Sequence, residues 1–130
     1  MIKAVNDWSK VKRAIDVGCG SGILVNAMAM QLKKDEISGY VIGLDQGNLM
    51  ALKTAVIEGV EDYGTCKECN AHALPFSDNY FDVLSSALYN LHEPGTAADQ
   101  RIKGLEEIVR VLKPGGFGVV WCKVINTLCF

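Results

Sequence analysis

The stretch IDVGCGSG, residues 15–22, contains the motif that determines how the rest of the chain is interpreted. It overlaps the end of a short apolar run, 13–17, which is typical of a buried strand. Its three glycines let the backbone turn sharply and approach a ligand without interference from Cβ atoms. The next segment, 23–34, is rich in Ala, Met and Leu and predicts a helix. A strand, a glycine-rich turn and a helix in this order indicate the first unit of an α/β fold.

The same alternation of strand and helix continues along the sequence. Apolar runs and helical periodicity predict strands at 39–44, 66–70, 81–88 and 117–124, and helices over 49–63 and 96–112. The strands are apolar on both faces, which requires a parallel sheet covered by helices on each side. The predicted fold class is therefore α/β, a Rossmann-like three-layer sandwich whose ligand site lies at the carboxyl ends of the strands.

Length and composition narrow the classes of protein. The 130 residues suit a single domain, 1–130, and 49% apolar with 22% charged residues is typical of a globular chain. A formal net charge of −2, with Lys and Arg scattered among acids, gives no direct sign of nucleic-acid binding. No apolar run reaches the roughly 18 to 20 residues that span a bilayer, so no membrane is expected. The polar start carries no readable signal peptide, and the expected location is cytoplasmic.

Five cysteines, an odd number, are best explained as free thiols in a reducing compartment. Cys66 and Cys69 form a CxxC pair, a spacing that redox and zinc sites both use. A redox pair would have a helix starting after its first cysteine, and a zinc site would have a second pair. Neither feature is visible, so we interpret these residues as unrelated thiols near a short strand and expect no metal site.

Two acidic residues flank the glycine motif. Asp16 lies two residues before Gly18, and Asp45 follows the second predicted strand, where a carboxylate can accept hydrogen bonds from both hydroxyls of a ribose. A dinucleotide-binding loop has the pattern GxGxxG, whose third glycine would fall at Ile23, and Asp16 would repel its pyrophosphate. S-adenosylmethionine instead carries an ammonium and a sulfonium, which suit an acid at position 16. A turn without any ligand is disfavoured, because three spaced glycines and an acid at the next strand end are costly to keep otherwise.

Four blocks of the sequence together resemble the class I S-adenosylmethionine-dependent methyltransferases, in particular those with LPF and LKPGG signatures. The blocks, in the order and spacing of that family, are IDVGCGSG (15–22), GLDQG (43–47), CNAHALPFSDNYFDVLSSAL (69–88) and EIVRVLKPGG (107–116). The resemblance covers most of residues 13–124. It implies a mainly parallel sheet with the strand order 3-2-1-4-5 and S-adenosylmethionine as the cofactor.

The resemblance also assigns roles to individual residues. It places Asp16 and the glycine loop at the methionine part of the cofactor, Asp45 at the ribose, and the backbone and side chains that follow the next strands at the adenine and the methyl group. The cofactor-binding residues expected on this basis are Asp16, Gly18, Cys19, Gly20, Gly22, Asp45, Gln46, Asn70, Ala71 and Ala87. The family usually has Asp where Asn70 stands; an amide oxygen still accepts a hydrogen bond, so weaker binding is expected.

The function implied by the resemblance is transfer of a methyl group to an unidentified acceptor. His92, in the loop after the fourth predicted strand, has an unperturbed pKa suited to a general base, with Tyr89 or Asn90 orienting a substrate. A packing or loop-capping histidine is the alternative. Two other functions stay open: a non-catalytic S-adenosylmethionine-binding or interaction module, and an NAD-dependent oxidoreductase, which Asp16 and Ile23 disfavour.

The family's sheet normally has seven strands, and the sequence predicts only five, so strands six and seven are expected to be missing. The strand at 117–124 would then form an edge with apolar Val119, Val120 and Trp121. Because exposed apolar edges template association, we expect either a homo-oligomer through this edge or a fragment of a longer chain.

Overall fold

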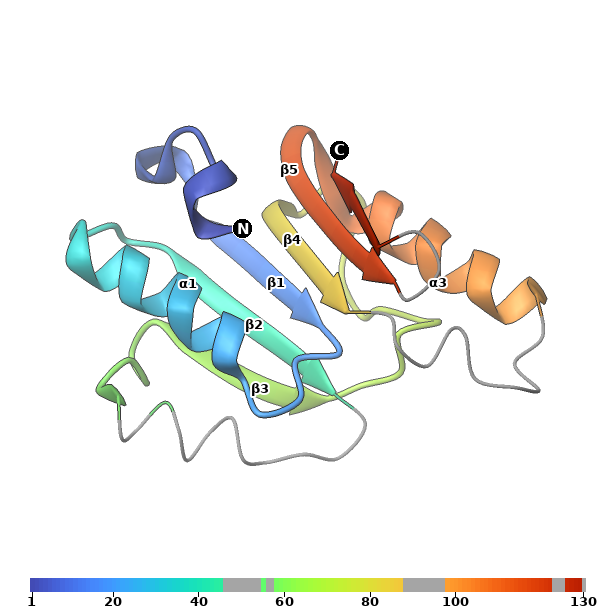
Figure 1. Ribbon diagram of the computed structural model, residues 1–130, viewed down its shortest axis with the longest axis horizontal. Coiled ribbons are helices and arrows are strands. Elements are labelled where there is room, and N and C mark those ends of the chain that lie inside the picture. Colours follow the sequence, from blue (N-terminus) through green and yellow to red (C-terminus); the bar gives the residue numbers. More distant parts are fainter. Residues whose placement is uncertain (46–54, 56–57, 88–97, 123–125, 130) are drawn as a thin grey trace.

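The computed structural model describes residues 1–45, 55, 58–87, 98–122 and 126–129, and its elements alternate as predicted (Figure 1). The strands are β1 (Arg13–Val17), β2 (Tyr40–Asp45), β3 (Gly64–Glu68), β4 (Phe81–Ala87), β5 (Leu112–Cys122) and β6 (Asn126–Cys129). The described helices are α1 (Ile23–Lys34) and α3 (Ala98–Val111), and two short 3-10 turns, Ile2–Ala4 and Trp8–Lys10, precede β1. None of these described helices is long and apolar enough to cross a membrane.

The strands form a single sheet with the order β3-β2-β1-β4-β5-β6. β1 to β5 run parallel to their neighbours, whereas β6 is antiparallel to β5. The α/β class and the order 3-2-1-4-5 are therefore confirmed. The chain adds β2 and β3 on one side of β1 and then β4 and β5 on the other. Ligands of such sheets bind outside the carboxyl ends of the strands at this switch point.

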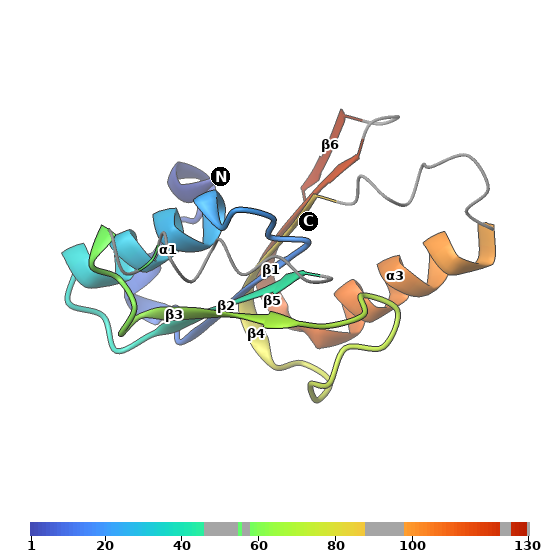
Figure 2. The same cartoon turned by 90° about the horizontal axis from the view of Figure 1, so that it is seen from below.

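Helices cover both faces of the sheet, giving three layers (Figure 2). Successive side chains of a strand point to opposite faces, and Ala14 and Ile15 of β1 accordingly belong to different apolar clusters. The first cluster packs α1 against one face through Val25, Met28, Ala29 and Leu32. The second cluster packs Ile108 and Val111 of α3 against the other face. β1 is therefore buried between two apolar clusters, and the glycine motif begins at its carboxyl end.

We expected the fifth strand to form an edge of the sheet. This expectation is wrong for the part of β5 that pairs with β6. Residues 119–122 of β5 are paired with β6, from Val119 with Cys129 to Cys122 with Asn126. The apolar edge on which the expected dimer depended is therefore already covered over these residues. A strand of four residues is too short to show a periodicity, and it pairs through backbone groups that any residue carries.

Two of the boundaries that differ from the sequence-based expectation lie at glycines. The helix predicted over 49–63 lies mostly outside the described residues, but Glu58 is helical and Gly59 already adopts a φ of +70°, so a turn follows it. Gly64 then opens β3 instead of stopping the helix, and β3 begins two residues earlier than predicted. Residues 113–116, which contain Pro114-Gly115-Gly116 and lie between the predicted helix and the strand predicted at 117, are part of β5, where the pairing with β4 shifts between Phe81 and Val83.

Candidate functional site

The glycine motif folds back over the end of β2. Val17, the last residue of β1, is paired with Leu44 of β2. The backbone amides of Gly18 and Cys19 both donate to the carbonyl oxygen of Leu44, at 2.7 and 2.9 Å. The amide of Gly22, where α1 begins, donates to the carbonyl oxygen of Cys19 at 2.9 Å. These bonds fix the loop between β1 and α1 above the carboxyl edge of the sheet.

The glycines of the motif are required by the backbone conformation. Gly18, Gly20 and Gly22 have φ values of +80°, +53° and +82°, the left-handed region that a Cβ atom disfavours. A Cβ atom built on Gly20 would meet no heavy atom within 4 Å. The outer side of the loop at Gly20 is therefore open, and a ligand can approach the backbone there.

Asp16 is a buried carboxylate directly beneath this loop, with 4% of its surface exposed. Ser85, its partner in the register of β1 and β4, donates a hydrogen bond from Oγ to Asp16 Oδ1 at 2.6 Å. Burial raises the pKa of Asp16, the hydrogen bond from Ser85 lowers it and the nearby charge of Asp45 raises it, so that the pKa lies at about 6. A carboxylate in this environment favours a cationic partner, because a positive charge would stabilise its ionised form.

Asp45 ends β2 beside the same loop and is half-buried. Its negative charge acts on Asp16, so the two carboxylates share one region at the ends of adjacent strands. Its carbonyl oxygen accepts a hydrogen bond from the amide of Cys69 at 3.0 Å, which draws the chain after β3 to the same edge. These groups fit S-adenosylmethionine chemically. A buried acid suits its cationic end, a second acid can accept hydrogen bonds from its hydroxyls, and the glycine backbone nearby is open.

Asn70 and Ala71 lie just after β3, in the segment that Cys69 holds at this edge. Asn70 Oδ1 accepts a hydrogen bond from the amide of His72 at 2.9 Å, a local turn that fixes the side chain. The same oxygen has a second lone pair with which to accept a bond from an amino group. Ala71 packs against the apolar cluster on the α3 face. The predicted adenine contacts are thus on a pre-formed turn.

Arg110 of α3 anchors the remainder of this segment. Its guanidinium donates to the carbonyl oxygens of Leu74 and Phe76, at 2.9 and 2.7 Å. It also pairs with Glu107 at 2.7 Å and with Asp78 at 2.9 Å. Glu107 in turn accepts a bond from the amide of Leu74 at 2.8 Å. The segment that follows the turn at Asn70 is therefore anchored to α3.

Replacing Arg110 with alanine should lower the free energy of unfolding by about 2 kcal/mol. Two backbone carbonyls lose their donors, at roughly 1 kcal/mol each, whereas the partly exposed ion pairs contribute little. Urea unfolding measures the loss, with the exposed Lys103→Ala on the same helix as the control. A loss no greater than that of the control would show that Arg110 does not anchor this segment.

The other predicted site residues stand as follows. Gln46 and the proposed base His92, with Tyr89 and Asn90, lie outside the described residues, so these roles stay predictions. Ala87 is the last residue of β4 and pairs with Trp121 of β5, which puts its backbone at the carboxyl edge.

Ser85 is a site residue that the sequence analysis missed. Its signal was present, because two adjacent serines, Ser85 and Ser86, interrupt an otherwise apolar strand. Buried hydroxyls need hydrogen-bond partners, and the structure supplies them: Asp16 Oδ1 for Ser85, and for Ser86 the carbonyl oxygen of Val17 at 3.1 Å. Which partner each serine takes depends on the pairing of β1 with β4, which no local pattern reveals.

Cys66 and Cys69 do not face one another. Cys66 lies within β3 with its sulfur 3.5 Å from that of Cys19, whereas Cys69 donates to the carbonyl oxygen of Asn70 at 3.5 Å. Among the described residues no three His, Cys, Asp or Glu side chains are grouped to hold a metal ion. The two sulfurs of the CxxC pair therefore have different partners.

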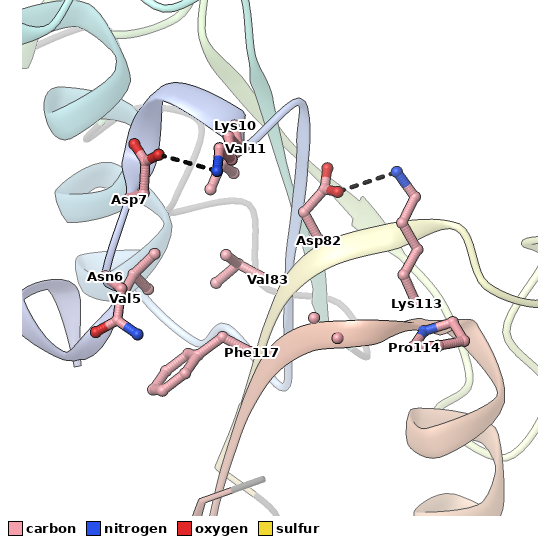
Figure 3. Close-up of a pocket in the computed structure, with 12 residues that line it drawn as sticks. Val5, Asn6, Asp7, Lys10, Val11, Asp82, Val83, Lys113, Pro114 and Phe117 are labelled. Carbon is pink, nitrogen blue, oxygen red and sulfur yellow. Dashed lines mark hydrogen bonds and ion pairs between the residues drawn. The ribbon is translucent and has the colours of Figure 1, made fainter.

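A hollow of about 440 Å³ lies at the opposite edge of the sheet, between the N-terminal segment and the starts of β4 and β5 (Figure 3). Its charged groups neutralise one another: Lys10 pairs with Asp7 at 3.7 Å, and Lys113 with Asp82 at 3.0 Å. Burial raises the pKa of Asp82, but bonds from Lys113 and from backbone amides outweigh this effect and hold it below its usual value. The charged side chains that line this hollow are paired with one another. The candidate site is therefore the carboxyl edge of the sheet.

Comparison with known proteins places these features in context. A family model described as "Methyltransferase domain" matches residues 15–120. The chain is 37% identical over 106 residues to a protein of Lactobacillus johnsonii named demethylmenaquinone methyltransferase, covering 79% of this chain and 40% of that protein. It is 31% identical over 118 residues to a ubiquinone/menaquinone biosynthesis C-methyltransferase of Geobacter sulfurreducens, covering 87% and 42% respectively. The chain thus spans about two fifths of the length of these relatives.

Solved structures with a similar fold include those of methyltransferases. A structure from Methanococcus maripaludis, described as that of a putative S-adenosyl-L-methionine-dependent methyltransferase, superposes with a TM-score of 0.72 at 25% identity, over 93% of this chain and 52% of that one. The YcgJ protein of Bacillus subtilis superposes with a TM-score of 0.70 at 28% identity, over 92% and 47%.

Proposed function

The chain belongs to the methyltransferase-domain family, whose cofactor is S-adenosylmethionine, and we propose that the carboxyl edge of β1 and β2 binds this molecule for methyl transfer to an acceptor. One observation carries the proposal. Two carboxylates, Asp16 and Asp45, lie close together at the ends of adjacent strands, next to an open glycine loop. This combination suits a ligand that has a cationic end and a ribose.

The candidate site residues have different roles in this proposal. Asp16, held by Ser85, attracts the cationic end of the ligand. Gly18, Cys19, Gly20 and Gly22 form the loop along which the methionine part lies. Asp45 accepts from the ribose hydroxyls, Gln46 and Ala71 border the adenine, and Asn70 accepts from its amino group. When bound, the cofactor supplies a methyl group on a sulfonium leaving group.

The acceptor side involves residues at the end of β4. Ala87 would border the methyl group, and His92 would take the proton of an acceptor that arrives protonated. The alternatives differ in measurable ways. A binding module without turnover would bind the cofactor and transfer no methyl group, and an NAD-dependent oxidoreductase would bind NAD in preference to S-adenosylmethionine. The free thiols of Cys19, Cys66 and Cys69 support a reducing, cytoplasmic location.

Asp45→Ala tests the proposed site. The variant should bind S-adenosylmethionine about tenfold more weakly, because even one lost hydrogen bond to a charged acceptor costs roughly 1.5 kcal/mol. Isothermal titration calorimetry measures the affinity, with Asp62→Ala, an exposed acid in the turn before β3, as the matched control. Unchanged affinity in Asp45→Ala would remove this residue from the site. Tighter binding of NAD than of S-adenosylmethionine by the unaltered chain would contradict the proposal as a whole.

A further inference from the structure

Cys19 and Cys66 are 47 residues apart in the chain, and their Sγ atoms lie 3.5 Å apart. Both thiols are free, and each residue has 8% of its surface exposed. Cys19 belongs to the glycine loop and Cys66 to β3, so the contact joins the proposed cofactor loop to a strand on the far side of β2.

The fold brings the two sulfurs together over Gly43. Gly43 of β2 is the register partner of Cys66, and Cys19 is held above β2 by the bond from its amide to Leu44. A Cβ atom on Gly43 would lie 2.6 Å from the sulfur of Cys66 and 2.9 Å from that of Cys19. The two sulfurs therefore occupy the space that a side chain at position 43 would take. The juxtaposition follows from the strand register and the loop geometry, and it is independent of the CxxC spacing.

The two thiols are not equivalent. The hydrogen bond between the two sulfurs lowers the pKa of Cys66. The same contact raises the pKa of Cys19, whereas burial and the negative charges of Asp16 and Asp45 act in the same direction on both thiols. Cys66 is thus the first of the pair to ionise, and a thiolate is the form that reacts with oxidants.

We propose that Cys19 and Cys66 form a reversible disulfide when the protein meets a hydroperoxide, and that this bond weakens cofactor binding by displacing the glycine loop. The thiolate of Cys66 attacks one oxygen of hydrogen peroxide, the O–O bond breaks, and the products are a sulfenic acid and hydroxide, which takes up the proton that Cys66 lost. The sulfur of Cys19 then attacks the sulfenic sulfur, the S–O bond breaks, and the thiol proton leaves with the hydroxyl as water. Two thiols are oxidised by two electrons and one peroxide is reduced to two waters.

The effect on the loop follows from distance. A disulfide has an S–S length of about 2.05 Å, so the sulfurs must approach by about 1.5 Å from their separation of 3.5 Å. The backbone at Cys19 has glycine on both sides, whereas Cys66 is held within the ladder of β3. The loop therefore moves toward β3, away from the position set by Leu44. This consequence for the cofactor rests on the proposed function; formation of the bond does not.

The test has two independent readouts on the full chain. After treatment with hydrogen peroxide, denaturation and alkylation, mass spectrometry should find a peptide pair cross-linked through Cys19 and Cys66, with the other cysteines alkylated, and dithiothreitol should reverse it. Calorimetry with S-adenosylhomocysteine should then show about a tenfold loss of affinity in the oxidised chain, the cost of roughly one hydrogen bond to the loop. Cys66→Ala and Cys66→Ser should bind equally well before and after peroxide, and the control Cys69→Ser should respond like the unaltered chain.

The outcomes separate the two proposals. If Cys19 and Cys66 both stay reduced, pair with other cysteines or go to sulfinic acids, the disulfide site is overturned. If the bond forms and affinity is unchanged, the effect on the loop is overturned. If the reduced chain binds no S-adenosylhomocysteine, the proposed function fails, and the peptide map still decides the disulfide.

Discussion

S-adenosylmethionine should bind about tenfold more weakly at pH 5 than at pH 7. Burial raises the pKa of Asp16 to about 6 in the unliganded chain, so the carboxyl group loses its charge within this range. The ionised fraction falls about tenfold between pH 7 and pH 5, and a cationic ligand binds only the ionised form well. Calorimetry at several pH values measures the slope.

Asp16→Asn provides the control for this prediction. At pH 7 the variant should bind S-adenosylmethionine about ten- to a hundredfold more weakly, because a charged hydrogen-bond acceptor is worth roughly 1.5 to 3 kcal/mol. The amide has no charge to lose, so the affinity of the variant should change less between pH 7 and pH 5. Equal slopes for the variant and the unaltered chain would assign the pH dependence to another group.

The same substitution should have the opposite effect on stability. The folded-state pKa of Asp16, about 6, lies above the ordinary value of 3.8. Folding therefore favours the protonated form, and stability is lost as the pH rises from about 4 to about 6. At pH 7, Asp16→Asn should raise the free energy of unfolding by up to about 3 kcal/mol, since a shift of one pKa unit corresponds to 1.36 kcal/mol. Greater stability with weaker binding is typical of a functional residue, because a purely structural residue would lose both.

Gly43→Val should lower the free energy of unfolding by about 3 kcal/mol or more. A Cβ atom at this position would lie 2.6 Å from the sulfur of Cys66, 2.7 Å from a methyl carbon of Val25 and 2.9 Å from the sulfur of Cys19. Overpacking of a dense core costs about 1–3 kcal/mol, and valine adds two methyl groups to a position where even alanine has no space. Urea unfolding followed by circular dichroism measures the loss.

A double substitution shows whether the clash with sulfur is the cause. Gly43→Ala should destabilise the chain, and Cys66→Ala alone should leave a small cavity in it. Together the two changes should cost less than the sum of the single effects, because the new methyl group occupies the space that the sulfur vacates. Strictly additive costs would mean that the sulfur of Cys66 does not limit the space at position 43.

Local patterns were sufficient for much of the fold. The first strand and the helix over 23–34 have the predicted bounds, because an apolar run, three glycines and a strong helix former follow in direct succession. The predicted helix over 49–63 ends too late, because Gly64 directly after a helical stripe resembles a stop signal, whereas Gly59 already ends that turn. The short strand β6 carries no periodicity from which it could be predicted.

The candidate site was likewise predicted only in part. Asp16, Asp45 and the glycines could be selected from their positions relative to the predicted strand ends. The bond from Ser85 to Asp16 and the contact between Cys19 and Cys66 could not, because each depends on the register between strands that are far apart in the chain. Residues that touch across a sheet are visible only once the order β3-β2-β1-β4 is known.

That strand order also has a consequence during synthesis. The ribosome adds β4, one neighbour of β1, 69 residues after β1, as the separation of Asp16 and Ser85 shows. At roughly 5 to 20 residues per second, about 3 to 14 s pass on the ribosome before one side of this apolar strand can be covered. The nascent chain therefore exposes an unpaired strand edge of the kind that chaperones bind, and slower translation before residue 81 should increase its aggregation.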